Sequence, residues 1–206
     1  NIYFHVGNDS AALRHYQLSL DLAERIGNTS SVSTALGNIG LVHKRLNDYP
    51  TALSYYQQSL LAAEKSNDIP QLSYSYTLMG NMYEELNQNT KAYDYYYKGL
   101  MSSKKTGEKS GIARGYVSLG LLKNIEKSYA EAISMCGKGL AFAEQAGAIE
   151  HKIEAYECLY EACKAMGRKG EALEYFEKLT ALKKIVQIEE AAKDLERMEF
   201  ANMMLQ

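Results

Sequence analysis

Small and aromatic apolar residues return along this chain at a constant interval. Five alanines, each opening a stretch of nine residues with the same pattern, stand forty residues apart at positions 12, 52, 92, 132 and 172. In the stretch 52–60 the alanine is followed by an aromatic residue four positions later, Tyr56, and by an apolar residue eight positions later, Leu60. A fixed period of this size predicts a stacked array of repeated units that share one continuous core.

The spacing inside one unit predicts two helices. Leu36, Ile39, Gly40 and His43 lie three and four residues apart, which places them on one face of a helix over about 31–46. A turn with Pro50 then starts a second helix that ends near residue 66. The same pattern predicts helices over 71–86, 90–105, 110–125, 129–146, 150–166 and 170–184.

Glycines mark both the close contacts and the helix ends. Gly40, Gly80 and Gly120 are predicted where the two helices of a hairpin cross, with the period-40 alanines opposite them. The residues four beyond the alanines are expected to fill the space towards the next repeat: Tyr16, Tyr56, Tyr96 and Phe176. Cys136 stands in that place in the fourth unit, which predicts a looser junction there. Predicted helix C-caps in the left-handed conformation are Gly27, Asn67, Gly107 and Gly147.

The spacing Tyr76-x2-Met79-Gly80-x2-Tyr83-x8-Ala92-x3-Tyr96 resembles the tetratricopeptide repeat (TPR), in the 40-residue variant also found in kinesin light chains. The resemblance implies an all-α, right-handed superhelix of helix-turn-helix repeats, an α-solenoid. It divides 1–181 into a partial first repeat and four further units, 1–28, 29–68, 69–108, 109–148 and 149–181. Tyr160 departs from the pattern, because it replaces the glycine in the fifth unit.

The first residues extend the pattern backwards. Tyr3 stands nine residues before Ala12, the place that His43 holds before Ala52. The chain is therefore expected to open partway through a first helix, either as a piece of a longer protein or with its beginning missing.

A different pattern begins after Thr180. Residues 182–206 contain no proline or glycine and predict one long helix, in which Ile185, Ile188, Ala192 and Leu195 follow 3-4-3 steps. Two roles fit this segment, a cap on the last repeat and a short coiled coil. The segment is also similar to the helical linker of bacterial signalling proteins in which a TPR array precedes an output domain, namely a nucleotide cyclase, a histidine kinase or a DNA-binding domain.

Composition and motifs exclude several function classes. A net charge of −2, from 23 basic and 25 acidic residues, gives no basic surface for nucleic acid. No apolar run is long enough for a membrane span, and the sequence contains no signal peptide. The four histidines are scattered over different units, and carboxylate pairs such as Glu84-Glu85 are interpreted as ordinary solvated helix charges. We expect no catalytic residues, no metal and no cofactor.

The cysteines and tyrosines have simpler interpretations. Three cysteines are too few for a disulfide framework, and Cys136, Cys158 and Cys163 are interpreted as small buried apolar residues. Tyr93, Tyr95 and Tyr97 surround one helix and cannot all face the core, so they divide between the repeat junction and an outer surface that is either packed or binds a partner.

The TPR resemblance places candidate ligand contacts on the first helices, which line the concave side of such arrays. The inner positions that it implies are Asn38, Leu41, Lys44, Arg45, Tyr74, Thr77, Asn81, Glu84, Arg114, Val117, Leu121 and Asn124. Asparagine amides both donate to and accept from a peptide backbone. The fifth unit adds Glu154, Glu157 and Glu161, so the sign of charge changes along the groove and would orient a ligand charged at both ends.

The sequence therefore predicts a non-enzymatic scaffold that binds a protein or peptide in its concave groove, as a sensory or regulatory module of a larger bacterial signalling protein. One alternative is a fragment of an adenylate or guanylate cyclase or a histidine kinase whose catalytic domain lies beyond residue 206. The other is a structural adaptor that self-associates as a homodimer through its terminal helix.

Overall fold

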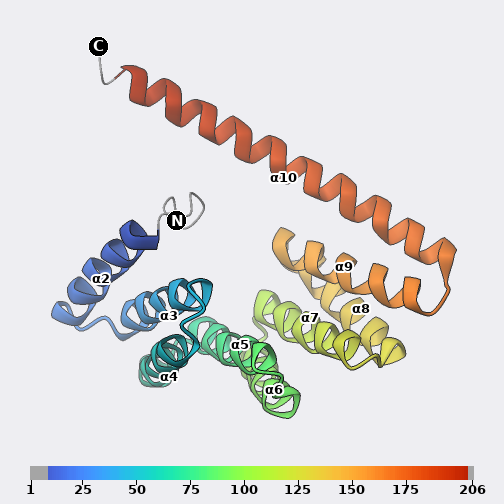
Figure 1. Cartoon of the computed structure of the whole chain (residues 1–206), viewed down its shortest axis with the longest axis horizontal. Coiled ribbons are helices and arrows are strands. Elements are labelled where there is room, and N and C mark those ends of the chain that lie inside the picture. The colour runs from blue at the N-terminus through green and yellow to red at the C-terminus, as the bar shows by residue number, and fades with distance from the viewer. Residues whose placement is uncertain (1–8, 204–206) are drawn as a thin grey trace.

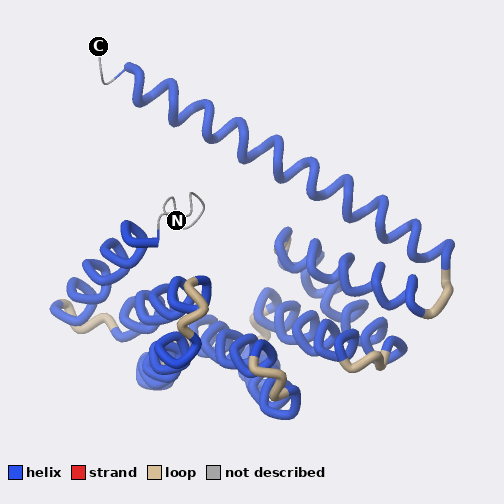
Figure 2. Tube along the Cα trace, in the orientation of Figure 1, coloured by secondary structure: helices blue, strands red, loops and turns tan. Residues whose placement is uncertain are grey.

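The computed structural model describes residues 9–203, and within this range the chain is a row of helices joined by short turns, without a strand (Figures 1 and 2). The helices are α2 (Asp9–Arg25), α3 (Thr29–Arg45), α4 (Tyr49–Ser66), α5 (Ile69–Glu85), α6 (Asn89–Thr106), α7 (Lys109–Ile125), α8 (Tyr129–Ala146), α9 (Ile149–Ala165) and α10 (Lys169–Met203). The all-α solenoid is confirmed. The expected opening inside a first helix falls on residues 1–8, outside the described part.

Residues in the left-handed backbone conformation end the helices, both at the turns between hairpins and at the turns inside them. Asn67, Gly107 and Gly147 have φ between 55° and 72° at the ends of α4, α6 and α8, as predicted. The turns inside the hairpins use the same conformation at Asn47, Asn87, Lys127 and Gly167. Glycine and asparagine, which tolerate positive φ, hold all of these positions except Lys127, so helices end at regular intervals that match the 40-residue period.

The α3–α4 and α5–α6 hairpins are each held by an aromatic ring packed over a glycine. A Cβ built on Gly40 would stand 2.6 Å from Cε1 of Tyr56, and one on Gly80 would stand 2.3 Å from Cε1 of Tyr96. Both tyrosines are almost fully buried. The glycines thus mark the crossing as predicted, but the tyrosine ring rather than the alanine side chain is what faces them, because the ring needs the volume that a Cβ would take.

Buried hydroxyl groups join consecutive hairpins in the first half of the array. Ser33 Oγ on α3 donates to the Ser59 carbonyl on α4, and Ser59 Oγ donates to the Ser33 carbonyl, both at 2.8 Å. Ser75 Oγ on α5 lies 3.3 Å and 3.2 Å from these two hydroxyl oxygens. Small side chains let three helices approach closely, and the mutual hydrogen bonds remove the cost of burying the hydroxyls.

The junction between the fourth and fifth repeats corrects two expectations. Cys136 on α8 and Cys158 on α9 are joined by a disulfide, with their Cα atoms 6.3 Å apart, so these two residues are not free apolar side chains. Cys163 is free and buried, as expected. Cys136 lies over Gly120, where the other hairpins place a tyrosine. The expectation of a looser junction did not include the covalent bond that crosses it from α8 to α9.

The fifth repeat has no glycine to receive a ring, and its aromatic residue is displaced. Phe176 does not fill the space towards a next repeat; it is 47% exposed and packs beside Tyr160, with ring centroids 5.4 Å apart. Tyr160 occupies the position of the missing glycine and leaves no room for a ring there, so Phe176 lies at the surface. Helix α10 passes through the predicted boundary between residues 181 and 182 without interruption and, in the view of Figure 1, extends far beyond α9 in the direction of α2.

Candidate functional site

The first helices of the hairpins form the inner side of the curve. Neighbouring first helices contact each other, α3 with α5, α5 with α7 and α7 with α9, whereas second helices in the described part make no comparable contact with one another. A row of helix pairs whose first members are closer together must curve towards those members. The exposed faces of α3, α5, α7 and α9 therefore form the concave face, where the candidate residues were expected.

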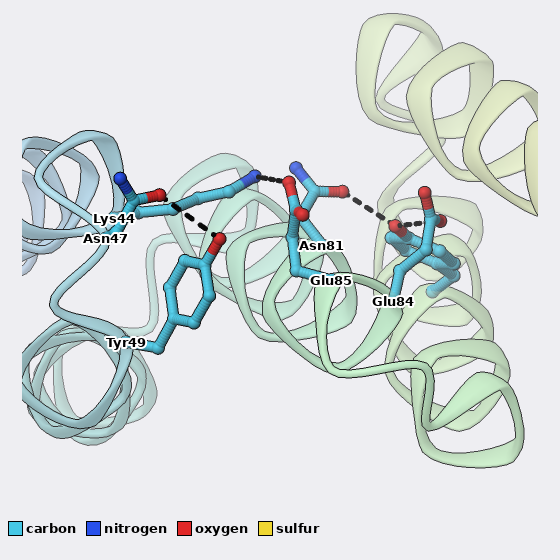
Figure 3. A network of polar contacts seen from close by, with 7 residues as sticks. Lys44, Asn47, Tyr49, Asn81, Glu84 and Glu85 are labelled. Carbon is cyan, nitrogen blue, oxygen red and sulfur yellow. Dashed lines mark hydrogen bonds and ion pairs between the residues drawn. The ribbon is translucent and has the colours of Figure 1, made fainter.

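A polar network connects three elements along the concave face (Figure 3). Lys44 Nζ on α3 lies 2.8 Å from Glu85 Oε1 on α5 and forms an ion pair with it. The Tyr96 hydroxyl on α6 lies 2.7 Å from Asn81 Oδ1 and 2.9 Å from Glu84 Oε2, which both accept its hydrogen bond. Tyr96 was expected as a packing residue alone. Its ring fills the hairpin core while its hydroxyl reaches the concave side.

Of the two adjacent acids, Glu85 is exposed, as expected of a helix surface charge, whereas Glu84 is half-buried. Burial raises the pKa of Glu84 above the usual 4.5, while the hydrogen bond from Tyr96 and the charge of Lys44 act in the opposite direction. Burial also raises the pKa of Tyr96, and the neighbouring Glu84 raises it further, so this hydroxyl remains a donor at physiological pH. The interpretation as a solvated helix charge therefore fails for Glu84, because adjacent acids on a fully exposed helix give the same sequence pattern.

Among the predicted groove residues that the structure describes, Arg114 on α7 is a cation that forms no ion pair. Its guanidinium carbon lies 5.3 Å from the ring centroid of Tyr74 on α5, within the range of a cation–π interaction. Its Nη1 atom is buried and has no hydrogen-bond partner among the described residues. Burial lowers the pKa of Arg114, and the negative charges of Glu108, Glu154 and Glu150 oppose this shift from a distance.

The other predicted cations are already paired. Lys44 contacts Glu85, and Arg45 on α3 forms an ion pair with Asp9 on α2. In the fifth repeat, Glu157 pairs with Lys183 of α10 at 2.5 Å, and Glu154 lies 3.1 Å from His151. The predicted change in the sign of charge along the groove therefore rests on Arg114 alone for the positive charge and on the acidic residues of α9 for the negative charge.

The remaining predicted groove residues divide into accessible and buried groups. Val117 and Thr77 are buried in the core, and Thr77 donates its hydroxyl to the Ser73 carbonyl, so neither can touch a ligand. Asn124 donates to the Cys158 carbonyl at 2.8 Å and serves the α7–α9 junction. Asn38, Leu41 and Leu121 are half-buried on the first helices, where they were expected.

The outer tyrosines divide between junction and surface as predicted. Tyr95 on α6 stacks on Tyr83 of α5 with ring centroids 5.3 Å apart, which places it at a helix junction. Tyr93 and Tyr97 stack on each other at 6.1 Å, and Lys123 lies over the Tyr93 ring. Their packing against each other and against a lysine uses much of the aromatic area that a partner would need.

The described residues carry neither a metal-binding cluster nor a membrane-spanning helix. Residues 9–203 hold no group of three histidine, cysteine or acidic side chains that could bind a metal ion. Among the described helices none combines the length and apolarity of a transmembrane span.

Comparisons with known proteins agree with this architecture. The family model described as Tetratricopeptide repeat matches residues 1–65 and 31–105. No curated protein sequence matches the chain. Similar solved structures include a Rap protein complexed with Competence and Sporulation Factor, with a TM-score of 0.75, 17% identity, and coverage of 88% of this chain and 51% of that one.

Two further structures share the fold. Aspartyl phosphate phosphatase F from Bacillus subtilis has a TM-score of 0.67 at 16% identity, with coverage of 84% of this chain and 50% of that one. A Podosopora anserina kinesin light chain with TPR-like repeats has a TM-score of 0.63 at 16% identity, with coverage of 90% of this chain and 91% of that one. The chain thus spans about half the length of the Rap protein and of the phosphatase.

Proposed function

The chain belongs to the tetratricopeptide repeat family, and from this premise we propose that it is a binding module that holds an extended peptide on its concave face. The observation that carries the proposal is Arg114, a half-buried guanidinium with an unpartnered nitrogen, stacked on Tyr74 in the middle of that face. A desolvated guanidinium without an acceptor is costly, and a ligand oxygen would remove that cost.

The charges around Arg114 define the ligand further. A carboxylate or backbone carbonyl of the peptide accepts from Arg114, and a basic side chain of the same peptide lies towards Glu150 and Glu154 of α9. Lys44 and Arg45 contribute little to this polarity, because Glu85 and Asp9 neutralise them. Asn38, half-buried on α3 and without a side-chain hydrogen bond in the described structure, supplies a backbone contact at the other end.

We further propose a regulatory role in which ligand binding changes the curvature of the array and thereby the direction of α10. Helix α10 is both the second helix of the fifth hairpin and the segment that leaves the array, and Lys183 anchors it to Glu157 of α9. A ligand that binds one curvature more tightly shifts the population towards it. The complex of a similar Rap protein with Competence and Sporulation Factor supports a ligand-bound TPR array as a precedent.

The test begins with selection of binders from a library of random linear peptides displayed on phage, using the 206-residue chain as bait. We expect enriched peptides to carry an acidic and a basic residue at a fixed separation. Arg114→Gln, which keeps size and polarity but loses charge, should abolish the preference for the acidic residue and weaken the selected peptides by at least tenfold.

Two control variants separate the site from the fold. Lys138→Gln removes an outer charge on α8, over the Tyr116 ring, and should leave peptide affinity unchanged. Tyr96→Phe removes the hydroxyl that engages Asn81 and Glu84 and leaves Arg114 unchanged, and so shows whether loss of this network alone alters peptide affinity. Equal affinity of wild type and Arg114→Gln for every selected peptide would refute the proposal.

A further inference from the structure

Helix α10 is twice as long as its neighbours and is covered by the array only at its beginning. Its 35 residues span about 52 Å at the α-helical rise of 1.5 Å per residue. Within the described part it contacts α9 and makes no comparable contact with another helix. Figure 1 shows its far end projecting away from α9. A helical segment with so little cover is stabilised in water mainly by packing on something else.

One face of the projecting segment carries an apolar stripe, which we call the α10 stripe and define as Ile185, Ile188, Ala192 and Leu195. The three large side chains are 50%, 61% and 57% exposed. Their 3-4-3 spacing is that of a and d positions over two heptads, with Ile185 at a and Ile188 at d. Leu182 and Val186 are half-buried and lie outside this stripe.

The charged residues beside the α10 stripe favour one partner helix and one relative direction of the two helices. With Ile185 at a, Lys184 occupies a g position and Glu189 an e position. In a parallel dimer in register, a g residue meets the e residue five positions further along the other helix, so Lys184 meets the partner's Glu189 twice by symmetry. In an antiparallel dimer with the same layers, Glu189 instead faces the partner's Glu189, which is repulsive.

We propose that a second copy of this chain covers the α10 stripe as a parallel, in-register two-helix coiled coil over residues 185–198. The chain itself supplies both complements that the stripe needs, an apolar seam of the same spacing and a carboxylate opposite Lys184. Both arrays then leave the same end of the coiled coil, so the two concave faces are related by a two-fold axis along α10. This inference does not depend on the proposed peptide site.

Sedimentation equilibrium of the 206-residue chain tests the assembly. We expect a monomer–dimer equilibrium for the wild type. Ile188→Glu should give a monomer at the same concentrations, because the residue is exposed and available for a partner in the wild type. Its circular dichroism spectrum should keep the helical signal of the array and lose only part of that of the uncovered end of α10. Leu22→Glu, a matched change at an exposed leucine of α2, should dimerise like the wild type.

The direction of the helices is tested by Glu189→Gln. A parallel dimer loses two attractive pairs and should dissociate roughly three- to fivefold more readily. An antiparallel dimer loses a repulsion and should become tighter. The exchange Lys184→Glu/Glu189→Lys should restore the wild-type affinity of a parallel dimer. A wild type that stays monomeric at 200 µM, an Ile188→Glu variant that still dimerises, or a tighter Glu189→Gln dimer would each overturn the proposal.

Discussion

At the scale of single residues, the hairpins depend on glycines that leave room for a ring. In Gly80→Ala the new methyl group would stand 2.3 Å from the Tyr96 ring, so the ring must move and its hydroxyl leaves Asn81 and Glu84. We expect a loss of about 1–3 kcal/mol in the free energy of unfolding, as for other overpacked cores. Urea denaturation followed by circular dichroism measures it.

Gly137→Ala is the matched control. Gly137 lies inside α8, and a Cβ built there meets nothing within 4 Å. Alanine is the better helix former, so this variant should be more stable by about 0.5–1 kcal/mol. Opposite signs for the same chemical change would locate the effect in the tyrosine contact, and equal signs would contradict it.

Glu84 should make stability depend on pH in a direction that is unusual for a carboxyl group. Burial raises its pKa in the folded chain above 4.5, so the fold favours the protonated form and ionisation costs stability as the pH rises through the raised pKa. Glu84→Gln keeps an acceptor for Tyr96 and cannot ionise. It should be more stable than the wild type at pH 7, and this advantage should disappear below pH 4.5.

Thermal unfolding of the two proteins from pH 4 to pH 8 measures the difference. Glu85→Gln is the control, since its side chain is exposed and interacts with Lys44 at the surface. A Glu84→Gln variant that is less stable than the wild type at pH 7 would mean that the carboxylate, not the acid, is the favoured form.

At the scale of elements, the α8–α9 junction is the one described junction between repeats that is closed covalently. The disulfide joins residues 22 positions apart, and a loop of this length predicts a stabilisation of about 3 kcal/mol from the restricted unfolded chain. The oxidised chain, denatured without reductant, should show one reactive thiol, from Cys163, and three after reduction. Reduction should also lower the melting temperature of the C-terminal repeats.

The Cys163→Ala variant distinguishes the effect of the disulfide from any effect of the free third cysteine. It should leave the effect of reductant on melting unchanged and give no reactive thiol when denatured under oxidising conditions. Three reactive thiols in protein that has never met a reductant would show that Cys136 and Cys158 are packed together without a bond.

Helices α3 to α9 were predictable to within two residues because each turn between them carries its own chemical signal, whereas 170–184 and 182–206 proved to be one helix, α10. Asn67, Gly107 and Gly147 supply left-handed ends, and the 40-residue period lets a clear turn in one unit define a weaker one in the next. The disulfide was not predictable in this way. Its two sulfur atoms belong to different helices, α8 and α9. The position of Cys136 depends on how it packs over Gly120 of α7, and no local sequence pattern encodes that packing.

The concave face was predicted in outline only. Arg114 and Val117 are three residues apart and therefore differ by about 60° around the helix, which is enough to turn Val117 into the core while Arg114 stays at the surface. Tyr96 was missed as part of the concave network because it comes from a second helix, and its hydroxyl reaches the inner face only through the ring that crosses the hairpin.

At the scale of the whole molecule, the array has almost no contacts between distant parts of the chain. Among the described helices each contacts its immediate neighbours, and the first helices α3, α5, α7 and α9 also contact the next first helix, so stability should be a sum of local terms rather than one cooperative property. A destabilising substitution in one repeat should then lower the stability of the neighbouring repeats, and this effect should decrease with distance along the array.

Hydrogen exchange followed by mass spectrometry distinguishes the two behaviours in Gly80→Ala. We expect faster exchange in α5 and α6, a smaller effect in α4 and α7, and none in α9, where the disulfide to α8 holds the far end of the array in place. The added methyl group acts only through Tyr96, so the increase in exchange should be largest in the helices that contact Tyr96 and smaller in helices further along the array. The same acceleration in every helix would mean that the repeats unfold as one unit, and that the core shared between neighbours is more cooperative than their contacts imply.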